Sequence, residues 1–373
     1  MGNKGLCPGD DGNKRMQETS ILLDVKEILQ NAYEMKASDI HLCVGSLPVA
    51  RVNGNLMPLV KYTKLSPEMT MSAIRQCLDE NKQNILMTKG EADASLSVPG
   101  IARYRINAFK QRGTYSLAFR QQPFDIPQFD TLGLPPIIKR FAELKQGLVL
   151  VTGVTGSGKS TTLASIVDMI NTRRKCHIIT IEEPIEYLHR HKNCLVNQRE
   201  VGLDSASFAS ALRSALREDP DVILVGEMRD LETISTALTA AETGHLVFST
   251  LHTSGAAKTI DRIIDVFPPT QQNQIRSQLA TVLEGVVSQM LIPKKDGKGV
   301  IPASEILIAN SAVRNLIREG KPYQIQSIIQ TGSALGMCTM ESSINKLYQD
   351  GFIAHDEMMG RVSMEKQIYQ TGR

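Results

Sequence analysis

The sequence predicts an α/β protein in which a small α+β domain precedes a larger domain with a mostly parallel, doubly wound sheet. Three observations favour this fold class. Residues 92–120 alternate apolar and polar side chains with the period of a strand, apolar segments alternate with helical patterns between 147 and 251, and a glycine-rich segment separates one such strand from a helix. Strands that alternate with helices are typical of parallel sheets.

Composition places the chain among ordinary globular proteins. It has 373 residues, of which 42% are hydrophobic and 22% charged, enough for two domains with separate cores. A net charge of +3 does not favour nucleic acid as a partner. The first twenty residues contain no apolar signal segment, and no apolar run reaches the roughly 18 residues that span a bilayer, so we expect a cytoplasmic protein without direct membrane insertion. Residues 1–18, rich in glycine and aspartate, predict a disordered tail.

The cysteines are few and widely spaced. They are Cys7, Cys43, Cys77, Cys176, Cys194 and Cys338. None lies at the two-residue spacing of a thiolate metal site, and the number is small for a disulfide framework. We therefore expect a reducing compartment and no zinc.

The first elements of the chain are predicted by capping and turn residues. Apolar residues at helical spacing predict a helix over 21–29 whose N-cap is Thr19 or Ser20. An Asn-Gly pair at 53–54 between two apolar segments predicts a hairpin. A Ser-Pro pair at 66–67 predicts the N-cap and the first residue of a second helix.

The next region predicts a strand with one core face and one polar face. The apolar set is Tyr104, Ile106 and Ala108, and the polar set is Arg103, Arg105 and Asn107. Residues 19–122 therefore predict an α+β domain on an antiparallel sheet. The segment 123–136 contains four prolines and has neither the period of a helix nor that of a strand, which predicts a semi-rigid linker.

The second predicted domain covers residues 137–373. We expect strands at 147–153, 177–181, 221–227 and 245–251, and helices at 160–171, 207–218 and 230–242. Residues 187–201 predict a hairpin, and the chain past about 310 has mostly helical periodicity. This order of elements predicts the doubly wound sheet.

The segment GVTGSGKS fits the pattern of a phosphate-binding loop, G-x-x-x-x-G-K-[ST], and follows a strand and opens a helix as that loop requires. Its glycines allow successive N–H groups to turn toward phosphates, Lys159 supplies a positive charge, and the Ser160 hydroxyl is a ligand for Mg²⁺. The predicted binding residues are Gly153, Val154, Thr155, Gly156, Ser157, Gly158, Lys159, Ser160 and Thr161. The sequence predicts a nucleoside triphosphate site that uses ATP and Mg²⁺.

Phosphoryl transfer also needs an acid near the metal and a group that orients the attacking water. Glu227 ends an apolar strand and is the first candidate for activating water or positioning the metal. The segment TIEEPIEY, also at a strand end, offers Glu182, Glu183 and Glu186 as further catalytic candidates, and Glu186 is the second choice after Glu227. Carboxylates this close together are common on solvated surfaces, but their place at a strand end favours the site.

Two histidines flank the apolar run of GHLVFSTLHT. Seven residues of strand separate His245 from His252 by roughly 23 Å, and an odd separation turns them to opposite faces, so they do not share one metal ion. A histidine at a strand end is more often structural than functional. His252 lies at the carboxyl end, where ligands bind in open α/β sheets, and is expected to orient water or sense the γ-phosphate. His245, at the entry end, is the weaker candidate.

Five stretches in this order resemble the motifs of the secretion-superfamily hexameric ATPases, a GspE/PilT-like family. GVTGSGKST, TIEEPIEY, LREDPDVILVGEMRDLETI and TAAETGHLVFSTLHT resemble its Walker A, Asp-box, Walker B and His-box motifs. AVRNLIRE resembles a motif, usually AIRNLIRE, of the PilT-type branch that retracts type IV pili. Two positions depart from the usual pattern: Val313 replaces Ile, and Glu183 replaces the Asp of TIEDPIE, which leaves any role of residue 183 open.

The resemblance implies a fold, an assembly and partners. It implies a PAS-like N-terminal domain, a RecA-like P-loop ATPase domain with C-terminal helices, and a ring of six copies. Each nucleotide would lie between the two domains, with Arg105 and Arg120 reaching the phosphates and Arg103 and Arg112 as weaker candidates. Guanidinium groups suit this task because they bind phosphate oxygens in pairs. The implied partners are an inner-membrane pilus platform protein and the pilus machinery, at the cytoplasmic face of that membrane.

The implied function is an ATP-hydrolysing motor for pilus retraction and twitching motility. Assembly ATPases usually carry a zinc module with CxxC pairs, which this sequence lacks, so retraction is favoured over assembly. In AVRNLIRE, a stripe of Val313, Leu316 and Ile317 predicts packing, while Arg314, Asn315 and Arg318 are expected to remain free for a partner. The alternatives are an accessory retraction ATPase, a type II or type IV secretion ATPase, and a low-turnover scaffold switched by ATP.

Overall fold

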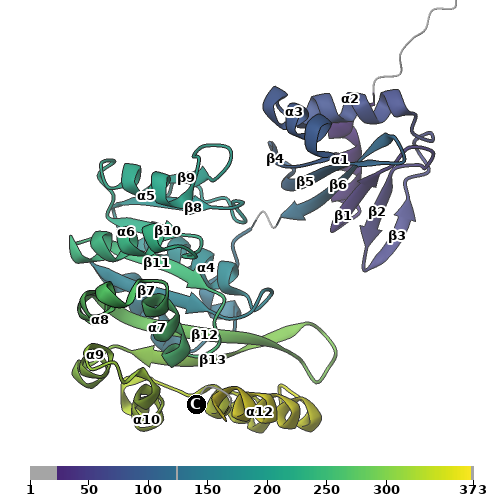
Figure 1. Cartoon of the computed structure of the whole chain (residues 1–373). Helices are drawn as coiled ribbons and strands as arrows, with labels where there is room; N and C mark the ends of the chain where they lie inside the picture. Colours follow the sequence, from purple (N-terminus) through teal and green to yellow (C-terminus); the bar gives the residue numbers. More distant parts are fainter. Residues whose placement is uncertain (1–22, 123–124, 371–373) are drawn as a thin grey trace, which may run out of the picture. The chain divides into compact units, whose positions relative to one another are not determined.

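The computed structural model describes residues 23–122 and 125–370. Contacts divide the chain into two compact units, Met1–Gln122 and Pro123–Arg373, and each unit is described by itself (Figure 1). The predicted tail, residues 1–18, lies outside the described residues. In the described part of the chain, no helix is long and apolar enough to cross a membrane.

The first unit is built on an antiparallel sheet of six strands in the order β3-β2-β1-β6-β5-β4. Its buried face packs against three helices around one apolar core. Tyr104, Ile106 and Ala108 of β5 are fully buried, as the alternation predicts, and the Tyr104 ring meets Phe119 edge to face. The elements are α1 (Val25–Glu34), β1 (Asp39–Leu42), β2 (Val49–Val52), β3 (Asn55–Pro58), α2 (Pro67–Cys77), α3 (Glu80–Lys89), β4 (Glu91–Val98), β5 (Ala102–Gln111) and β6 (Thr114–Gln122).

Local signals in this unit are confirmed with one exception. Asn53 and Gly54 both have positive φ, 50° and 84°, and turn β2 into β3 as an Asn-Gly hairpin requires. Ser66 caps α2 by accepting a hydrogen bond from the Met69 N–H. The N-cap predicted for the first helix is wrong, because α1 begins later and is capped by Asp24, another residue whose side chain suits that position.

The predicted linker is partly integrated into the second unit. Phe129 and Leu134 are buried in its main apolar core, and the Pro127 carbonyl accepts a hydrogen bond from the Ser165 hydroxyl at 2.6 Å. Two 3-10 helices, η1 (Phe129–Thr131) and η2 (Pro136–Glu143), continue this packing. The stretch that lacks a regular period is therefore anchored by apolar side chains at its carboxyl end.

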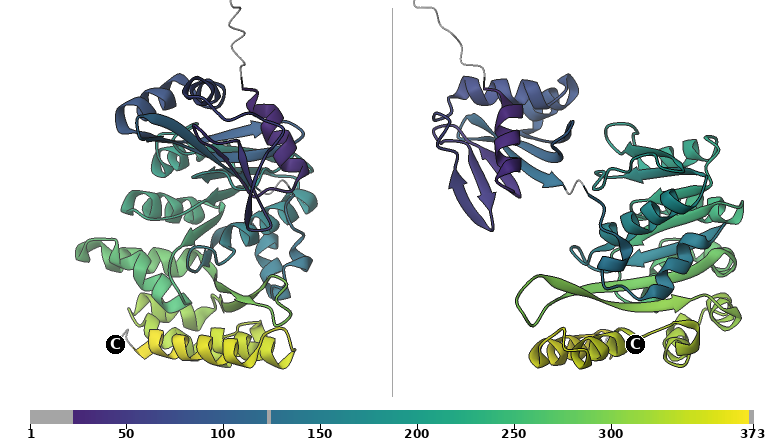
Figure 2. Two further views of the ribbon diagram at one scale, coloured as in Figure 1. Left: turned by 90° about the vertical axis from the view of Figure 1, so that its right-hand side faces the viewer. Right: turned by 180° about the vertical axis from the view of Figure 1, so that it is seen from behind.

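The second unit contains a seven-stranded sheet in the order β13-β12-β7-β11-β10-β8-β9, with helices on both faces (Figure 2). All neighbouring strands are parallel except β13, which runs antiparallel to β12. The central strands are buried on both faces, which explains their continuous apolar runs. The elements up to the last predicted strand are β7 (Gly147–Thr152), α4 (Lys159–Arg173), β8 (His177–Glu182), β9 (Leu195–Glu200), α5 (Phe208–Ala215), β10 (Val222–Val225), α6 (Leu231–Glu242) and β11 (Leu246–Leu251).

The hairpin predicted over residues 187–201 is wrong. β9 pairs parallel to β8, so the chain between them returns to the other end of the sheet before β9 begins. Asn171 at the end of α4 holds this return, since its amide donates to the Arg190 carbonyl at 2.7 Å and its side-chain oxygen accepts from the Lys192 N–H. A tertiary contact from α4 thus sets the strand direction, which the local sequence does not reveal.

The region between 255 and 310 holds elements beyond those predicted. They are α7 (Ala256–Asp265), α8 (Pro269–Val282), β12 (Leu283–Pro293) and β13 (Val300–Ile308). The β12–β13 hairpin extends past the other strands, with α12 beside it (Figures 1 and 2). Past residue 310 the chain is helical as predicted, with α9 (Ser311–Arg318), α10 (Ile325–Thr331), α11 (Met340–Gln349) and α12 (His355–Gln370).

Helix α9 carries the AVRNLIRE stretch and partly differs from expectation. Val313 and Ile317 are fully buried, and Leu316 is half-buried against the same core, as the stripe predicts. The expectation that Arg314 is free is wrong. Its guanidinium donates to the Ala280 and Thr281 carbonyls and pairs with Glu284 at 2.8 Å, because the last carbonyls of α8 need donors from outside their helix.

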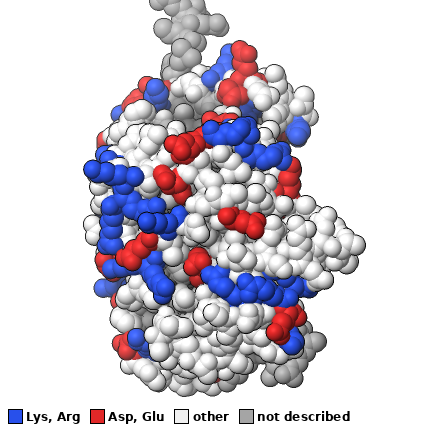
Figure 3. Space-filling model, turned by 90° about the vertical axis from the view of Figure 1, so that its left-hand side faces the viewer, with Lys and Arg blue, Asp and Glu red and all other residues white. Residues whose placement is uncertain are grey.

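Charged side chains of both signs are mixed on one face of the molecule (Figure 3). On the face seen in Figure 3, lysine and arginine side chains form several groups with acidic side chains beside them. This distribution agrees with a net charge of +3 and gives that face no broad field of one sign.

Candidate nucleotide-binding site

The loop between β7 and α4 has the backbone shape that phosphate binding requires. Gly153, Gly156 and Gly158 have φ of 140°, 79° and 87°, values that residues with a side chain rarely adopt. A Cβ at Gly153 would also lie 2.3 Å from the Gln289 carbonyl oxygen. Glycine is therefore required at the start of the loop for both conformation and space.

Lys159 is folded back onto its own loop. The side chain is buried, and its ammonium group donates to the Gly153 and Val154 carbonyls at 2.9 and 3.1 Å. Burial lowers the pKa of the Lys159 ammonium, and the nearby carboxylates of Glu186 and Glu227 oppose that shift. Both candidate acids thus act electrostatically on the lysine of the loop.

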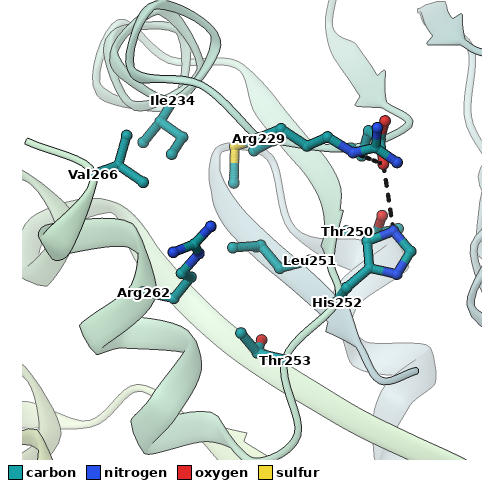
Figure 4. Close-up of a pocket in the computed structure, with 10 residues that line it drawn as sticks. Arg229, Ile234, Thr250, Leu251, His252, Thr253, Arg262 and Val266 are labelled. Atoms are coloured by element: carbon teal, nitrogen blue, oxygen red, sulfur yellow. Dashed lines mark hydrogen bonds and ion pairs between the residues drawn. The ribbon is translucent and has the colours of Figure 1, made fainter. Parts of the chain in front are cut away.

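Glu227 lies two residues past the end of β10, beside the carboxyl end of β11. Its carboxylate pairs with the Arg229 Nε at 2.7 Å and lies 3.4 Å from the His252 Nε2 (Figure 4). The Glu227 side chain is only 15% exposed, whereas His252 is 43% exposed. These residues line a cavity of about 410 Å³ between the strand ends and helices α6 and α7. The structure therefore brings together two of the predicted catalytic residues, Glu227 and His252.

The TIEEPIEY segment contacts the first turn of α4. The Tyr187 hydroxyl lies 2.9 Å from the Thr161 hydroxyl, which fixes the segment beside the first turn of α4. Glu182 accepts hydrogen bonds from the Thr180 hydroxyl at 2.6 Å and the Gln198 amide at 3.2 Å. Burial raises the pKa of the Glu182 carboxyl to about 7. Glu186 is exposed, which leaves it accessible to a ligand.

His245 lies at the opposite end of β11 from His252. Its ring Nδ1 is 2.9 Å from the Ala240 carbonyl oxygen, and its backbone N–H donates to the same oxygen at 3.1 Å. These contacts connect the end of α6 to the start of the strand. The geometry gives His245 a structural contact between α6 and β11.

Arg105 and Arg120 face each other across β5 and β6 in the first unit. Arg120 pairs with Asp39 at 2.9 Å and is 76% exposed. Burial alone would raise the pKa of Asp39, but hydrogen bonds from Arg120 and Ser38 outweigh it and hold that pKa below its ordinary value. The sheet thus presents a pair of arginines on its exposed face, as the alternation predicts.

Sequence reasoning missed residues that support the loop from other elements. Gln289 of β12 contacts Ser157 and Thr162, and Tyr187 contacts Thr161. No motif marks Gln289, whereas Tyr187 ends the TIEEPIEY segment, which carries no indication of its contact. A signal for Gln289 is present all the same, because the Ser-Gln pair at 288–289 follows the fully buried Val286 and Val287 and is itself only 1% and 3% exposed.

The oxygen donors of the site fit Mg²⁺ better than a transition metal. Ser160 and Glu227 offer a hydroxyl and a carboxylate, the ligands that Mg²⁺ uses together with phosphate oxygens and water. Among the described residues, no three His, Cys, Asp or Glu side chains gather into a metal-binding group.

The loop, the strand-end acid and the histidine on a doubly wound sheet define a P-loop ATPase. The chain belongs to the Type II/IV secretion system protein family, whose model matches residues 14–301.

Two relatives and one solved structure correspond to most of the chain. The chain is 48% identical over 334 residues to the type IV pilus retraction ATPase PilT of Pseudomonas aeruginosa, covering 90% of this chain and 96% of that protein. It is 50% identical to a twitching motility protein of Neisseria gonorrhoeae, with 82% of each chain covered. The crystal structure of the pilus retraction motor PilT with bound ADP matches with a TM-score of 0.84 at 50% identity, covering 91% of this chain and 96% of that one.

Proposed function

We propose that this protein is a hexameric motor that hydrolyses ATP at the cytoplasmic face of the inner membrane to drive type IV pilus retraction and twitching motility. The observation that carries the proposal is the similarity to a pilus retraction ATPase over nearly the full length of both chains. The buried face of AVRNLIRE on α9 supports it, because the stretch that resembles the retraction branch is part of the ATPase core.

The reaction converts ATP and water to ADP and phosphate. Lys159 and the loop N–H groups bind the phosphates, and Ser160 and Glu227 would hold Mg²⁺, which neutralises phosphate charge when it is bound. Glu227 is the first choice for activating water and Glu186 the second, with Glu182 holding the segment that carries Glu186.

His252 would orient the attacking water or sense the γ-phosphate through its contact with Glu227. Its 43% exposure leaves the ring accessible, and the distance of 3.4 Å to Glu227 allows a hydrogen bond to tighten when a nucleotide binds. Arg105 and Arg120 are proposed to bind phosphate oxygens, which suits two guanidinium groups placed opposite each other.

The proposed partners are five further copies of this chain, the inner-membrane pilus platform protein and the pilus machinery. Asn315 and Arg318 of α9 remain exposed and are candidates for contact with the platform or with a neighbouring copy.

Deletion of the gene tests the proposed function. Cells without it should carry more numerous pili that fail to shorten, and the parent gene should restore retraction. A Lys159→Ala gene serves as the control that supplies folded protein without turnover, and it should leave the cells piliated. Cells that retract pili normally after deletion would contradict the proposal and would favour an accessory or a secretion role.

A further inference from the structure

Gln289 lies where β12 passes behind the phosphate loop. The strands β12 and β7 pair up to Ser288 and Thr152, so Gln289 is the next residue along and lies beside Gly153. Gln289 is only 3% exposed, and its main-chain carbonyl oxygen occupies the space that a Cβ at Gly153 would need. The loop therefore rests on this residue of β12, which is far from it in sequence.

The Gln289 side chain ties two parts of the nucleotide site together. Its amide nitrogen donates to the Ser157 carbonyl at 2.7 Å, and its amide oxygen accepts from the Thr162 hydroxyl at 3.0 Å. Ser157 belongs to the loop, and Thr162 lies in the first turn of α4. Both hydrogen bonds are buried, so the loss of either one would leave a polar group without a partner and would cost free energy.

The bond to Ser157 also determines the direction of the next N–H group. A trans peptide is planar, with its carbonyl and N–H on opposite sides. When Gln289 holds the Ser157 carbonyl toward β12, the Gly158 N–H of the same peptide must point away from β12, the side on which the loop is exposed. Phosphate loops bind their ligand with N–H groups that converge on that side.

We propose that Gln289 is a positioning residue of the nucleotide site, which holds the peptide between Ser157 and Gly158 in its phosphate-binding orientation. The inference rests on the nucleotide-binding role of the loop and is independent of what the motor moves. Lys159, the charged residue of the same loop, donates to different carbonyls, those of Gly153 and Val154.

The first test is Gln289→Met, which keeps the length of the side chain and removes both hydrogen bonds. We expect the Kd for a fluorescent ADP analogue to rise tenfold or more, with a thermal melt to confirm that the variant is folded. Thr162→Val removes only the second bond and should give a smaller rise, because the Ser157 carbonyl keeps its donor.

The second test separates positioning from a purely structural role. In Gln289→Glu, a protonated carboxyl can donate to the Ser157 carbonyl and accept from Thr162, whereas an ionised one presents two acceptors to that carbonyl. The ratio of the variant Kd to the parent Kd should therefore increase tenfold or more between pH 6 and pH 9. Gln349→Glu, at the exposed end of α11, adds the same charge away from the site, and its ratio should stay near one.

Gln289→Met and Gln289→Glu together test whether Gln289 positions the loop. If Gln289→Met does not fold, the pH dependence of the Gln289→Glu Kd ratio is the test. A Gln289→Met protein that is folded and binds the ADP analogue as the parent does would overturn the proposal. So would a Gln289→Glu protein whose Kd ratio stays constant with pH while its melting temperature falls, because that pattern belongs to a packing role.

Discussion

Binding and turnover should separate when two charged groups of the site are removed one at a time. Lys159→Ala removes a buried ammonium that forms two hydrogen bonds within the free loop and is placed to transfer them to phosphate. A hydrogen bond to a charged group contributes about 1.5–3 kcal/mol. Counting one such bond as the net loss, because the free loop also satisfies the ammonium, we expect ATP affinity to fall about 10- to 150-fold, since each 1.4 kcal/mol is a factor of about ten.

Glu227→Gln changes the chemistry and leaves the shape of the site. The amide oxygen can still accept from Arg229, which lies 2.7 Å from the carboxylate in the parent, so the local packing should survive. An amide does not take a proton from water or match the charge of the carboxylate near a metal. A positioned general base contributes about 10²- to 10⁴-fold to a rate, so turnover should fall by that range while ATP affinity stays within a few-fold.

The assay pairs a fluorescent-nucleotide titration with steady-state phosphate release on the same preparations. Thermal melts of each variant with and without ADP show whether the protein is folded and whether it still binds. A Glu227→Gln protein with near-normal turnover would refute the assignment and would transfer the role to Glu186, the other acid whose charge acts on Lys159. Lys159→Ala with unchanged affinity would refute the role of the loop itself.

Three further predictions follow from other parts of the molecule. Burial raises the pKa of Glu182 from 4.5 to about 7, so its ionisation costs the folded state up to about 3 kcal/mol above pH 7 and nothing well below pH 4.5. Glu182→Gln should thus raise the free energy of unfolding at pH 8 but not at pH 4. Denaturant titrations that show equal effects at the two pH values would contradict this. Replacing Leu316 and Ile317 by Ala costs about 2–5 kcal/mol at a fully buried site and less at the half-buried Leu316; a variant that still folds and forms the ring should hydrolyse ATP within several-fold of the parent yet fail to retract pili, and normal twitching would defeat the role of α9. Elemental analysis of purified protein should find no zinc, and about one tightly held zinc per chain would refute that.

The sequence predicted those parts of the fold that depend on local chemistry. The Asn-Gly turn at 53–54, the Ser66 cap and the alternation along β5 each follow from the conformations that single residues prefer. The direction of β9 did not follow in the same way. It depends on Asn171, which holds the returning chain from a different element, and no periodicity within residues 187–201 records that contact.

In the candidate site too, residues marked by local sequence could be predicted, and residues held by contacts across the fold could not. The phosphate loop and Glu227 were predictable because each ends a buried strand and carries residues whose chemistry is specific. Gln289 was not, since a single hydrogen bond across the fold has no sequence pattern of its own. The contact of Tyr187 with Thr161 was not predictable for the same reason, although Tyr187 itself lies in TIEEPIEY. The Ser-Gln pair of β12 shows what such a signal looks like: two neighbouring polar residues that are almost completely buried within a strand.

Arg314 changes how the α9 motif should be understood. Taken alone, the sequence AVRNLIRE presents two arginines on an amphipathic helix, both available to a partner. In the structure one of them binds the last carbonyls of α8 and Glu284 at the start of β12, while Val313 and Ile317 are sealed in the core. Because β12 also carries Gln289 behind the phosphate loop, α9 is attached to the same strand that contacts the nucleotide site. A displacement of β12 would therefore move α9 with it, and the exposed Asn315 and Arg318 would carry that movement to whatever they contact.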